Sequence, residues 1–257
     1  MNEKILLIDL DGVLRLGDKP APGMAYFFDK LRRLEIPFAA LSNSTLYGSR
    51  EAREFFVKNG VPYNFPIITA VEAAARYVKE NYETAAVFVN ERVRYLFDDV
   101  IRSETPQAVV VGDLGKNWTF EIVNSIFKML LAGADLLALQ KNKYWKTDED
   151  GILIDAGAFV AGLEFAADKT ATLIGKPSPL YFRSGLKAAG GNEKSPFVML
   201  GDDLTSDIAG AKNIGGETIL ILTGKTTEDT LAASETKPDF IATDLIDAAS
   251  VIEKLYK

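Results

Sequence analysis

The sequence predicts an α/β protein built on a parallel sheet, and two observations support this fold class. Short apolar runs, of the kind that form buried strands, alternate almost throughout the chain with segments in which apolar residues recur at helical spacing. This strand–helix–strand order implies parallel strands joined by right-handed crossovers. The clearest run, Ile5 to Ile8, contains only apolar residues, as expected of a parallel strand that is buried on both faces.

The first part of the chain predicts three strands, each followed by a helix. Pro22 and Gly23 mark the entry of the first helix, and Asn59-Gly60 closes the second. The expected strands cover residues 5–8, 37–41 and 66–69, and the expected helices cover residues 24–34, 52–56 and 71–82.

The pattern restarts near residue 85, and a third phase begins near residue 171. In the second phase we expect strands at 85–89, 108–112, 135–140 and 151–154, and helices at 123–131 and 159–167. In the third phase we expect strands at 171–175, 197–201, 217–222 and 239–243, with helices between them and a last helix to Leu255. The chain has no internal repeat and no Gly/Ser-rich linker. A second domain would therefore be inserted into the first rather than appended to it.

The composition narrows the chemistry that the chain can perform. With 257 residues, 47% of them hydrophobic, the chain can build one large domain or two smaller ones. It contains no cysteine, which excludes disulfides, thiolate metal sites and cysteine nucleophiles. It also contains no histidine, which removes the commonest general base and the usual zinc ligands. Acid–base chemistry must therefore come from Asp, Glu, Lys or Tyr, and a bound metal must be a hard cation with oxygen ligands.

The charge and the N-terminal residues bear on partners and location. The formal charge is −7, from 29 basic and 36 acidic residues, which disfavours non-specific nucleic-acid binding. The first ten residues lack the features of a signal peptide, and no apolar run approaches the length of a membrane span. We therefore expect a soluble, cytoplasmic protein that binds neither nucleic acid nor membranes.

Several predicted strands end in residues that suit phosphate chemistry. Because ligands of open α/β sheets bind beyond the carboxyl ends of the strands, such endings predict a site. The residues concerned are Asp9 and Asp11 before Gly12, Ser42-Asn43, Lys176 after the strand at 171–175, and Asp202-Asp203 with Asp207. Each has a simpler interpretation as a solvated turn, a helix cap or a surface lysine. Four such endings on one sheet edge are hard to attribute to chance.

These residue types permit a specific reaction. A carboxylate can act as a nucleophile toward phosphorus, and crowded carboxylates together with a substrate phosphate favour Mg²⁺. A lysine and a serine hydroxyl can bind the oxygens of the phosphoryl group. A second carboxylate near the leaving oxygen can protonate it and then deprotonate the attacking water. No histidine is required for this chemistry.

The four segments resemble the ordered motifs of the haloacid dehalogenase superfamily. They are Asp9-Leu10-Asp11-Gly12-Val13, Ser42-Asn43, Gly175-Lys176-Pro177-Ser178-Pro179, and Gly201-Asp202-Asp203 with Asp207. The resemblance covers essentially the whole chain and is greatest to the subfamily with a large α/β cap, which includes NagD-type and para-nitrophenyl-phosphatase-type enzymes. Residues 112–115 and 142–146 resemble the branch that contains phospholysine phosphohistidine inorganic pyrophosphate phosphatase.

The resemblance implies a Rossmann-like catalytic core of residues 1–78 and 171–257, with an α/β cap over residues 79–170. It implies Asp9 as the nucleophile, Asp11 as the general acid/base, and Ser42, Asn43 and Lys176 as phosphate ligands. It further implies Mg²⁺ held by Asp9, the backbone carbonyl of Asp11, and Asp202, with Asp203 and Asp207 in support. Some members of the last-named branch lack this second aspartate, so the presence of Asp11 favours an active phosphatase and weakens the transfer of that branch's particular substrates. Family dehalogenases also generally lack an acid at this place, which counts against dehalogenase chemistry.

The expected function is therefore Mg²⁺-dependent hydrolysis of a small phosphorylated metabolite through an aspartyl-phosphate. Selectivity would come from the cap, where Asp113, Lys143 and Trp145 are candidate specificity residues, although a ring packed on the cap and a solvated lysine are simpler interpretations. Alternatives are a mutase on the same fold, a non-catalytic phosphate-binding protein, and a signalling receiver, which is about half as long. The physiological substrate stays open, as does a homodimer formed through exposed apolar positions on the cap.

Overall fold

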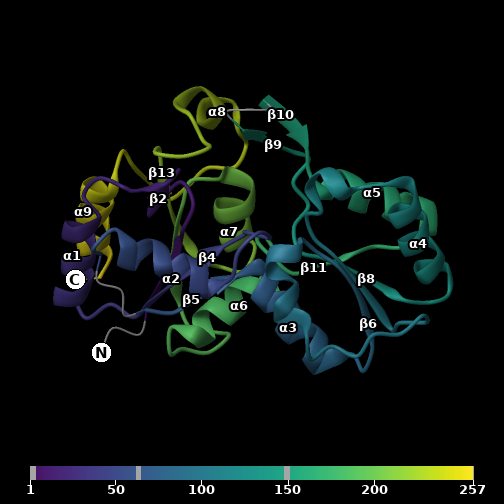
Figure 1. Cartoon of the computed structure of the whole chain (residues 1–257). Coiled ribbons are helices and arrows are strands. Elements are labelled where there is room, and N and C mark those ends of the chain that lie inside the picture. Colours follow the sequence, from purple (N-terminus) through teal and green to yellow (C-terminus); the bar gives the residue numbers. More distant parts are fainter. Residues whose placement is uncertain (1–3, 62–64, 148–150, 257) are drawn as a thin grey trace. The chain divides into compact units, whose positions relative to one another are not determined.

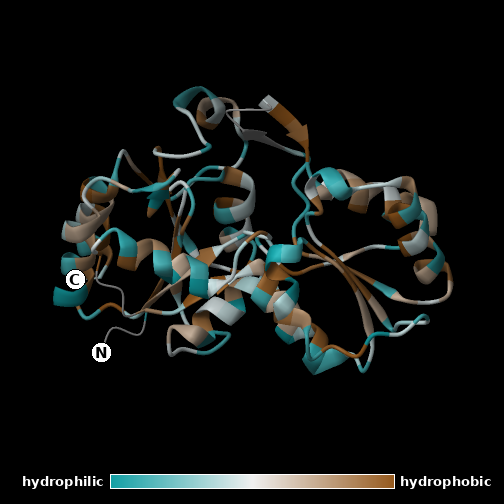
Figure 2. Ribbon diagram, in the orientation of Figure 1, coloured by the Kyte–Doolittle hydropathy of each residue, from teal (hydrophilic) through white to brown (hydrophobic). Residues whose placement is uncertain are grey.

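The computed structural model describes residues 4–61, 65–147 and 151–256. The chain divides into two compact units (Figure 1). Unit 1 comprises Met1–Ser42, Ser49–Ile68 and Lys176–Lys257, and unit 2 comprises Asn43–Gly48 and Thr69–Gly175. Each unit contains its own sheet. The strands of both sheets are among the most hydrophobic segments of the chain, as Figure 2 shows.

Unit 1 is built on a six-stranded sheet with the order β14-β13-β12-β1-β4-β5. The strands are β1 (Ile5–Asp9), β4 (Phe38–Ser42), β5 (Ile67–Thr69), β12 (Phe197–Gly201), β13 (Glu217–Ile221) and β14 (Phe240–Ala242). Neighbouring strands from β14 to β4 are parallel, which confirms the predicted α/β fold. The chain leaves β1 toward β4 on one side and returns to β12 on the other. The carboxyl end of β1 therefore lies at the switch point, where ligands of such sheets bind.

The helices of unit 1 alternate with these strands along the chain. They are α1 (Met24–Arg33), α2 (Ser49–Lys58), α6 (Pro179–Ala188), the π-helix η3 (Leu204–Ala209), α7 (Gly210–Lys212), α8 (Glu228–Ala233) and α9 (Leu245–Leu255). Helices α1 and α9 pack against each other, and α6 packs on β1 and β4. Helix α6 approaches closely at Gly185, where a Cβ atom would lie 2.9 Å from a methyl carbon of Leu41. A short hairpin, β2 (Arg15–Leu16) with β3 (Lys19–Pro20), follows β1.

Unit 2 contains a four-stranded parallel sheet with the order β11-β8-β7-β6. Its strands are β6 (Ala85–Phe88), β7 (Ala108–Val111), β8 (Asp135–Ala138) and β11 (Thr172–Leu173). Helix α3 (Ala70–Asn81) and the 3₁₀ helix η1 (Glu91–Phe97) share one apolar cluster with this sheet. Helices α4 (Phe120–Leu131) and α5 (Ala156–Ala167) pack into the other, on the opposite face (Figure 1). The remaining elements are η2 (Gly115–Asn117) and the hairpin of β9 (Tyr144–Thr147) and β10 (Gly151–Ile154).

The structure differs from the sequence-based expectation at the junctions between the two units. The strand expected at 171–175 is the short β11, which pairs with β8 in the sheet of unit 2. The expectation that its end shares an edge with the strands of the core sheet was therefore wrong, because a short apolar run does not reveal which sheet it joins. Residues 70–78 also belong to unit 2, since α3 buries Val71 and Val78 against its strands.

Strand β9 was also not expected, because the strands predicted in this part of the chain cover residues 135–140 and 151–154, whereas β9 begins at Tyr144. Within the described part of the chain, no helix has the length and apolar character that a membrane crossing requires.

Candidate active site

Strand pairing brings the predicted site residues of unit 1 together. Asp9 is the last residue of β1, which pairs with β12 so that Ile8 lies opposite Leu200. On the other side, Asp9 lies opposite Leu41 of β4. The next residues of these two neighbours are Gly201-Asp202 and Ser42. Parallel pairing therefore places an aspartate and a serine on the two sides of Asp9.

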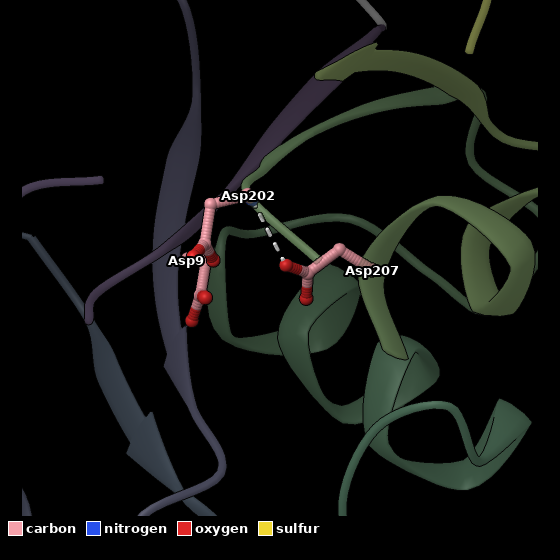
Figure 3. Close-up of side chains that lie close together, drawn as sticks. All are labelled: Asp9, Asp202 and Asp207. Atoms are coloured by element: carbon pink, nitrogen blue, oxygen red, sulfur yellow. Dashed lines mark hydrogen bonds between the residues drawn. The ribbon is translucent and has the colours of Figure 1, made fainter. Parts of the chain in front are cut away.

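Three buried carboxylates form a cluster at this edge: Asp9, Asp202 and Asp207. One carboxylate oxygen of each lies within 4.8 Å of the others. Asp207 comes from η3, and its Oδ2 accepts hydrogen bonds from the backbone N–H groups of Asp202 and Asp203, both at 3.2 Å. Figure 3 shows the three side chains and the bond from Asp202 to Asp207. The π-helix thus directs Asp207 back toward the ends of β1 and β12.

Lys176 is the cation of this cluster. Its Nζ lies 2.6 Å from Oδ1 of Asp9 and 2.6 Å from Oδ1 of Asp207, and its side chain is buried. Burial opposes the charged form of Lys176, but the charges of Asp207 and Asp9 outweigh burial and raise its pKa. Lys176 thus stays charged and balances one of the three negative charges.

The pKa values of two acids in the cluster, Asp9 and Asp202, are raised. Burial and the charge of Asp207 raise the pKa of Asp9 well above its ordinary value, and Lys176 only partly opposes them. Burial and Asp207 likewise raise the pKa of Asp202 to about 6. Both shifts mean that burial and the neighbouring carboxylate disfavour the ionised forms, which an added positive charge would stabilise. A hard divalent cation with oxygen ligands fits this donor set, so the cluster could hold a metal ion.

The other two predicted aspartates of unit 1 lie outside the cluster. The Asp11 carboxylate faces Arg15 and Ser42: Arg15 Nε donates to Oδ1 at 2.8 Å, and the Ser42 hydroxyl donates to Oδ2 at 2.9 Å. Asp203 caps η3 by accepting from the N–H groups of Thr205 and Ser206, and it pairs with Lys225. Asp11 follows β1 and contacts the residue that ends β4, whereas Asp203 caps the start of a helix.

Ser42 is held rigidly at the end of β4. The buried Tyr181 hydroxyl lies 2.6 Å from the carbonyl oxygen of Ser42 and 2.8 Å from that of Ile68. This hydroxyl ties β4 to β5 at the level of the site. Asn43, the next predicted residue, belongs to unit 2, where a Cβ atom at Gly175 would lie 2.7 Å from Asn43 Oδ1.

The turn after β13 also shapes the site, although the sequence analysis did not select it. The N–H of Lys225 donates to Asp202 Oδ2 at 2.6 Å, and the Thr223 hydroxyl donates to the carbonyl oxygen of Gly12 at 2.6 Å. A Cβ atom at Gly224 would lie 1.9 Å from Asp202 Oδ2. The available signal was that Thr223-Gly224-Lys225-Thr226 follows another apolar strand of the same sheet.

In unit 2, two of the three candidate specificity residues, Asp113 and Lys143, lie in different surroundings. Asp113 is buried after β7, and its Oδ1 accepts from the N–H of Gly115 at 2.6 Å. Lys143 is exposed just before β9. The side chain of Trp145 lies outside the described part of the structure. Nearby, Gln140 donates to the buried Asp155 at 2.6 Å, which fixes the end of β8 to the start of α5.

Comparison with known proteins identifies the family. A model of the haloacid dehalogenase-like hydrolases matches residues 6–100, and a HAD-hydrolase-like model matches residues 173–248. The haloacid dehalogenase-like hydrolase domain-containing protein 2 of Bos taurus is 33% identical over 223 residues, which cover 86% of this chain and 85% of that protein. The chain belongs to the haloacid dehalogenase-like hydrolases. The resemblance indicated by the four motifs is thereby confirmed.

Two further matches place this haloacid dehalogenase-like hydrolase among phosphatases in sequence and fold. A phospholysine phosphohistidine inorganic pyrophosphate phosphatase of Rattus norvegicus is 29% identical over 254 residues, which cover 96% of this chain and 93% of that protein. The crystal structure of a 4-nitrophenylphosphatase from Thermotoga maritima matches with a TM-score of 0.86 and 26% identity, covering 97% of each chain.

Proposed function

We propose that the protein is a Mg²⁺-dependent phosphatase that hydrolyses a small phosphate monoester through an aspartyl-phosphate. The observation that carries this proposal is the contact of the buried Lys176 with Asp9 and Asp207, beside Asp202, at the switch point of the sheet. The similarity of the chain to proteins named as phosphatases supports the same reaction class.

Asp9 is the proposed nucleophile. Lys176 and the N–H of Leu10, at 2.8 Å, both bind Asp9 Oδ1, so Oδ2 is the atom assigned to the attack. Oδ2 forms a bond to phosphorus while the bond to the leaving oxygen breaks, and Asp11 donates a proton to that oxygen. Water then attacks phosphorus and loses its proton to Asp11. The bond from phosphorus to Asp9 breaks, and inorganic phosphate leaves.

The remaining site residues are proposed to bind the phosphoryl group and the metal ion. Ser42 and Lys176 are the proposed ligands of the phosphoryl oxygens, with Asn43 following Ser42 in the chain. Mg²⁺ would be held by Asp9, Asp202 and the backbone carbonyl of Asp11, with Asp207 in support and Asp203 supporting indirectly as the cap of the helix that carries Asp207. When bound, the ion supplies positive charge to the phosphoryl oxygens. Lys176 orients the nucleophile and offsets its charge.

Substrate choice is assigned to unit 2, which we propose as the cap. The residues of unit 1 named above address only the phosphoryl unit, which all phosphate monoesters share. Discrimination must therefore come from contacts to the rest of the substrate, and Asp113, Lys143 and Trp145 are the proposed contributors. The proposed substrate class is a small phosphorylated metabolite.

The test is hydrolysis of para-nitrophenyl phosphate by the whole chain, with Mg²⁺ and with EDTA. We expect turnover that requires Mg²⁺ and disappears in Asp9→Asn, because the amide cannot form the phosphoenzyme. Asp18→Asn, at an exposed position of the β2–β3 hairpin, is the matched control and should keep full activity. Near-normal turnover by a folded Asp9→Asn protein would refute the covalent mechanism. Full activity in EDTA would refute the metal requirement.

A further inference from the structure

Arg15 holds one oxygen of Asp11, and Ser42 holds the other. Arg15 Nε donates to Asp11 Oδ1 at 2.8 Å, and Nη2 of the same guanidinium also contacts Oδ1. The Ser42 hydroxyl donates to Oδ2 at 2.9 Å. Arg15 is the first residue of β2 and Ser42 is the last residue of β4. Donors from two separate elements therefore contact the same carboxylate.

The position of Arg15 relative to Asp11 is fixed by the backbone. The N–H of Arg15 donates to the carbonyl oxygen of Leu10, and the carbonyl oxygen of Arg15 accepts from the N–H of Gly12, both at 2.8 Å. These bonds close the turn that carries Asp11. The guanidinium also lies over the ring of Phe55 in α2, 5.6 Å from its centroid, which adds a cation–π contact. Arg15 is therefore constrained at both its backbone and its tip.

Asp11 is only half-buried, so the donors that contact its carboxylate bear on its orientation. Its side chain is 43% exposed, whereas that of Arg15 is 21% exposed. A half-exposed carboxyl samples several rotamers unless donors select one. Because Ser42 is also the proposed phosphoryl ligand, Oδ2 is the oxygen on the phosphoryl side, and Oδ1 is the oxygen that Arg15 holds.

We propose that Arg15 is a positioning residue, which holds the Asp11 carboxyl so that Oδ2 is aimed at the leaving oxygen and the attacking water. This inference rests on the proposed function. An acid or base contributes only when it is oriented, and small misplacements cost large factors in rate. Lysine should replace Arg15 only in part, because an ammonium presents neither two donors in a plane nor a flat face to Phe55.

The consequence depends on the leaving group. 4-Nitrophenolate is a weak base and departs readily without a proton. The unsubstituted phenolate is a stronger base and departs more readily when the acid protonates its oxygen. The kcat/KM value reports the steps up to departure of the leaving group. Loss of Arg15 should therefore lower kcat/KM for phenyl phosphate more than for para-nitrophenyl phosphate. These substrates have nearly the same shape, so cap selectivity does not account for a difference.

The experiment measures kcat/KM for a series of substituted phenyl phosphates, plotted against the acidity of the phenol. The variants are Arg15→Ala, Arg15→Lys, Phe55→Leu and, as the benchmark, Asp11→Asn. Arg33→Ala is the control, because Arg33 is 75% exposed in α1 and forms a surface ion pair with Asp29, at 2.7 Å. Circular dichroism verifies that each variant is folded.

We expect Arg15→Ala to reproduce the steeper leaving-group dependence of Asp11→Asn, with about a tenfold to hundredfold loss on phenyl phosphate relative to para-nitrophenyl phosphate. Arg15→Lys and Phe55→Leu should show smaller changes of the same kind, and Arg33→Ala none. If Asp11→Asn steepens the dependence and neither Arg15→Ala nor Phe55→Leu does, this inference is wrong and the proposed function stands. If Asp11→Asn itself leaves the dependence unchanged, the proposed role of Asp11 is wrong, and the inference falls with it.

Discussion

The ammonium group of Lys176 lies 2.6 Å from Oδ1 of Asp9, although the chain reaches these two residues along strands of different sheets. Asp9 ends the central strand of unit 1, whereas Lys176 comes shortly after the edge strand of unit 2. The same ammonium is 2.6 Å from Asp207, so one buried cation bridges two members of the acidic cluster. This bridge leads to the first of four predictions.

Lys176→Met should destabilise the fold in EDTA by about 3–5 kcal/mol at pH 8, because it leaves buried carboxylates without their cation. The loss should be smaller at pH 5, where the acids with raised pKa values, Asp9 and Asp202, gain protons. Urea unfolding at both pH values measures the effect. Lys187→Met, at a mostly exposed lysine, is the control and should change little. An equal loss at both pH values would show that the carboxylates do not depend on Lys176.

Asp202→Asn should stabilise the metal-free protein at neutral pH. The pKa of Asp202 is raised from 3.8 to about 6, so between these values the folded state holds a proton that the unfolded state has released. The free energy of unfolding in EDTA therefore falls as pH rises from about 4 to about 6, and the neutral amide avoids this loss. We expect a gain of about 2–3 kcal/mol at pH 7.5 that vanishes near pH 4. A pH-independent difference in urea unfolding would contradict the assignment.

Gly224→Ala should weaken metal binding without unfolding the protein. The new Cβ atom would lie 1.9 Å from Asp202 Oδ2, so this carboxylate must move. Displacing a proposed ligand in this way should raise the Mg²⁺ concentration for half-maximal activity by about tenfold to a hundredfold. The Mg²⁺-induced rise in Tm should diminish in parallel. Gly162→Ala, where the Cβ atom meets nothing within 4 Å, is the control. Unchanged Mg²⁺ dependence in Gly224→Ala would remove Asp202 from the metal site.

Lys143→Ala tests the proposed specificity role of unit 2. Lys143 is exposed, so its loss should not disturb the fold. We expect a lower kcat/KM for substrates with an anionic leaving group and little change for para-nitrophenyl phosphate, because only the former offers a second charge to the lysine. A screen of phosphorylated metabolites supplies the anionic substrates. Equal loss of both activities, or of neither, would show that Lys143 is a solvated surface lysine.

Much of the fold was predictable from the sequence, because buried parallel strands and amphipathic helices leave local patterns. The run Ile5 to Ile8 predicted the central strand, and the helical spacing of residues 123–131 predicted α4. The β9–β10 hairpin and the sheet to which β11 belongs were not predicted. Strand pairing is a long-range choice, and an apolar run of two or three residues suits either sheet equally.

The candidate site was likewise predictable only in part from the sequence. The sequence by itself determined that acids, a serine and a lysine follow apolar runs, and that neither cysteine nor histidine takes part. Only the tertiary structure decided that Asp207 joins Asp9 and Asp202, that Asp203 caps a helix instead, and that Asp11 turns toward Arg15. The identity of a residue sets which bonds its side chain can form. Strand register and the path of the backbone set which partner lies within 3 Å, and that depends on segments far apart in the chain.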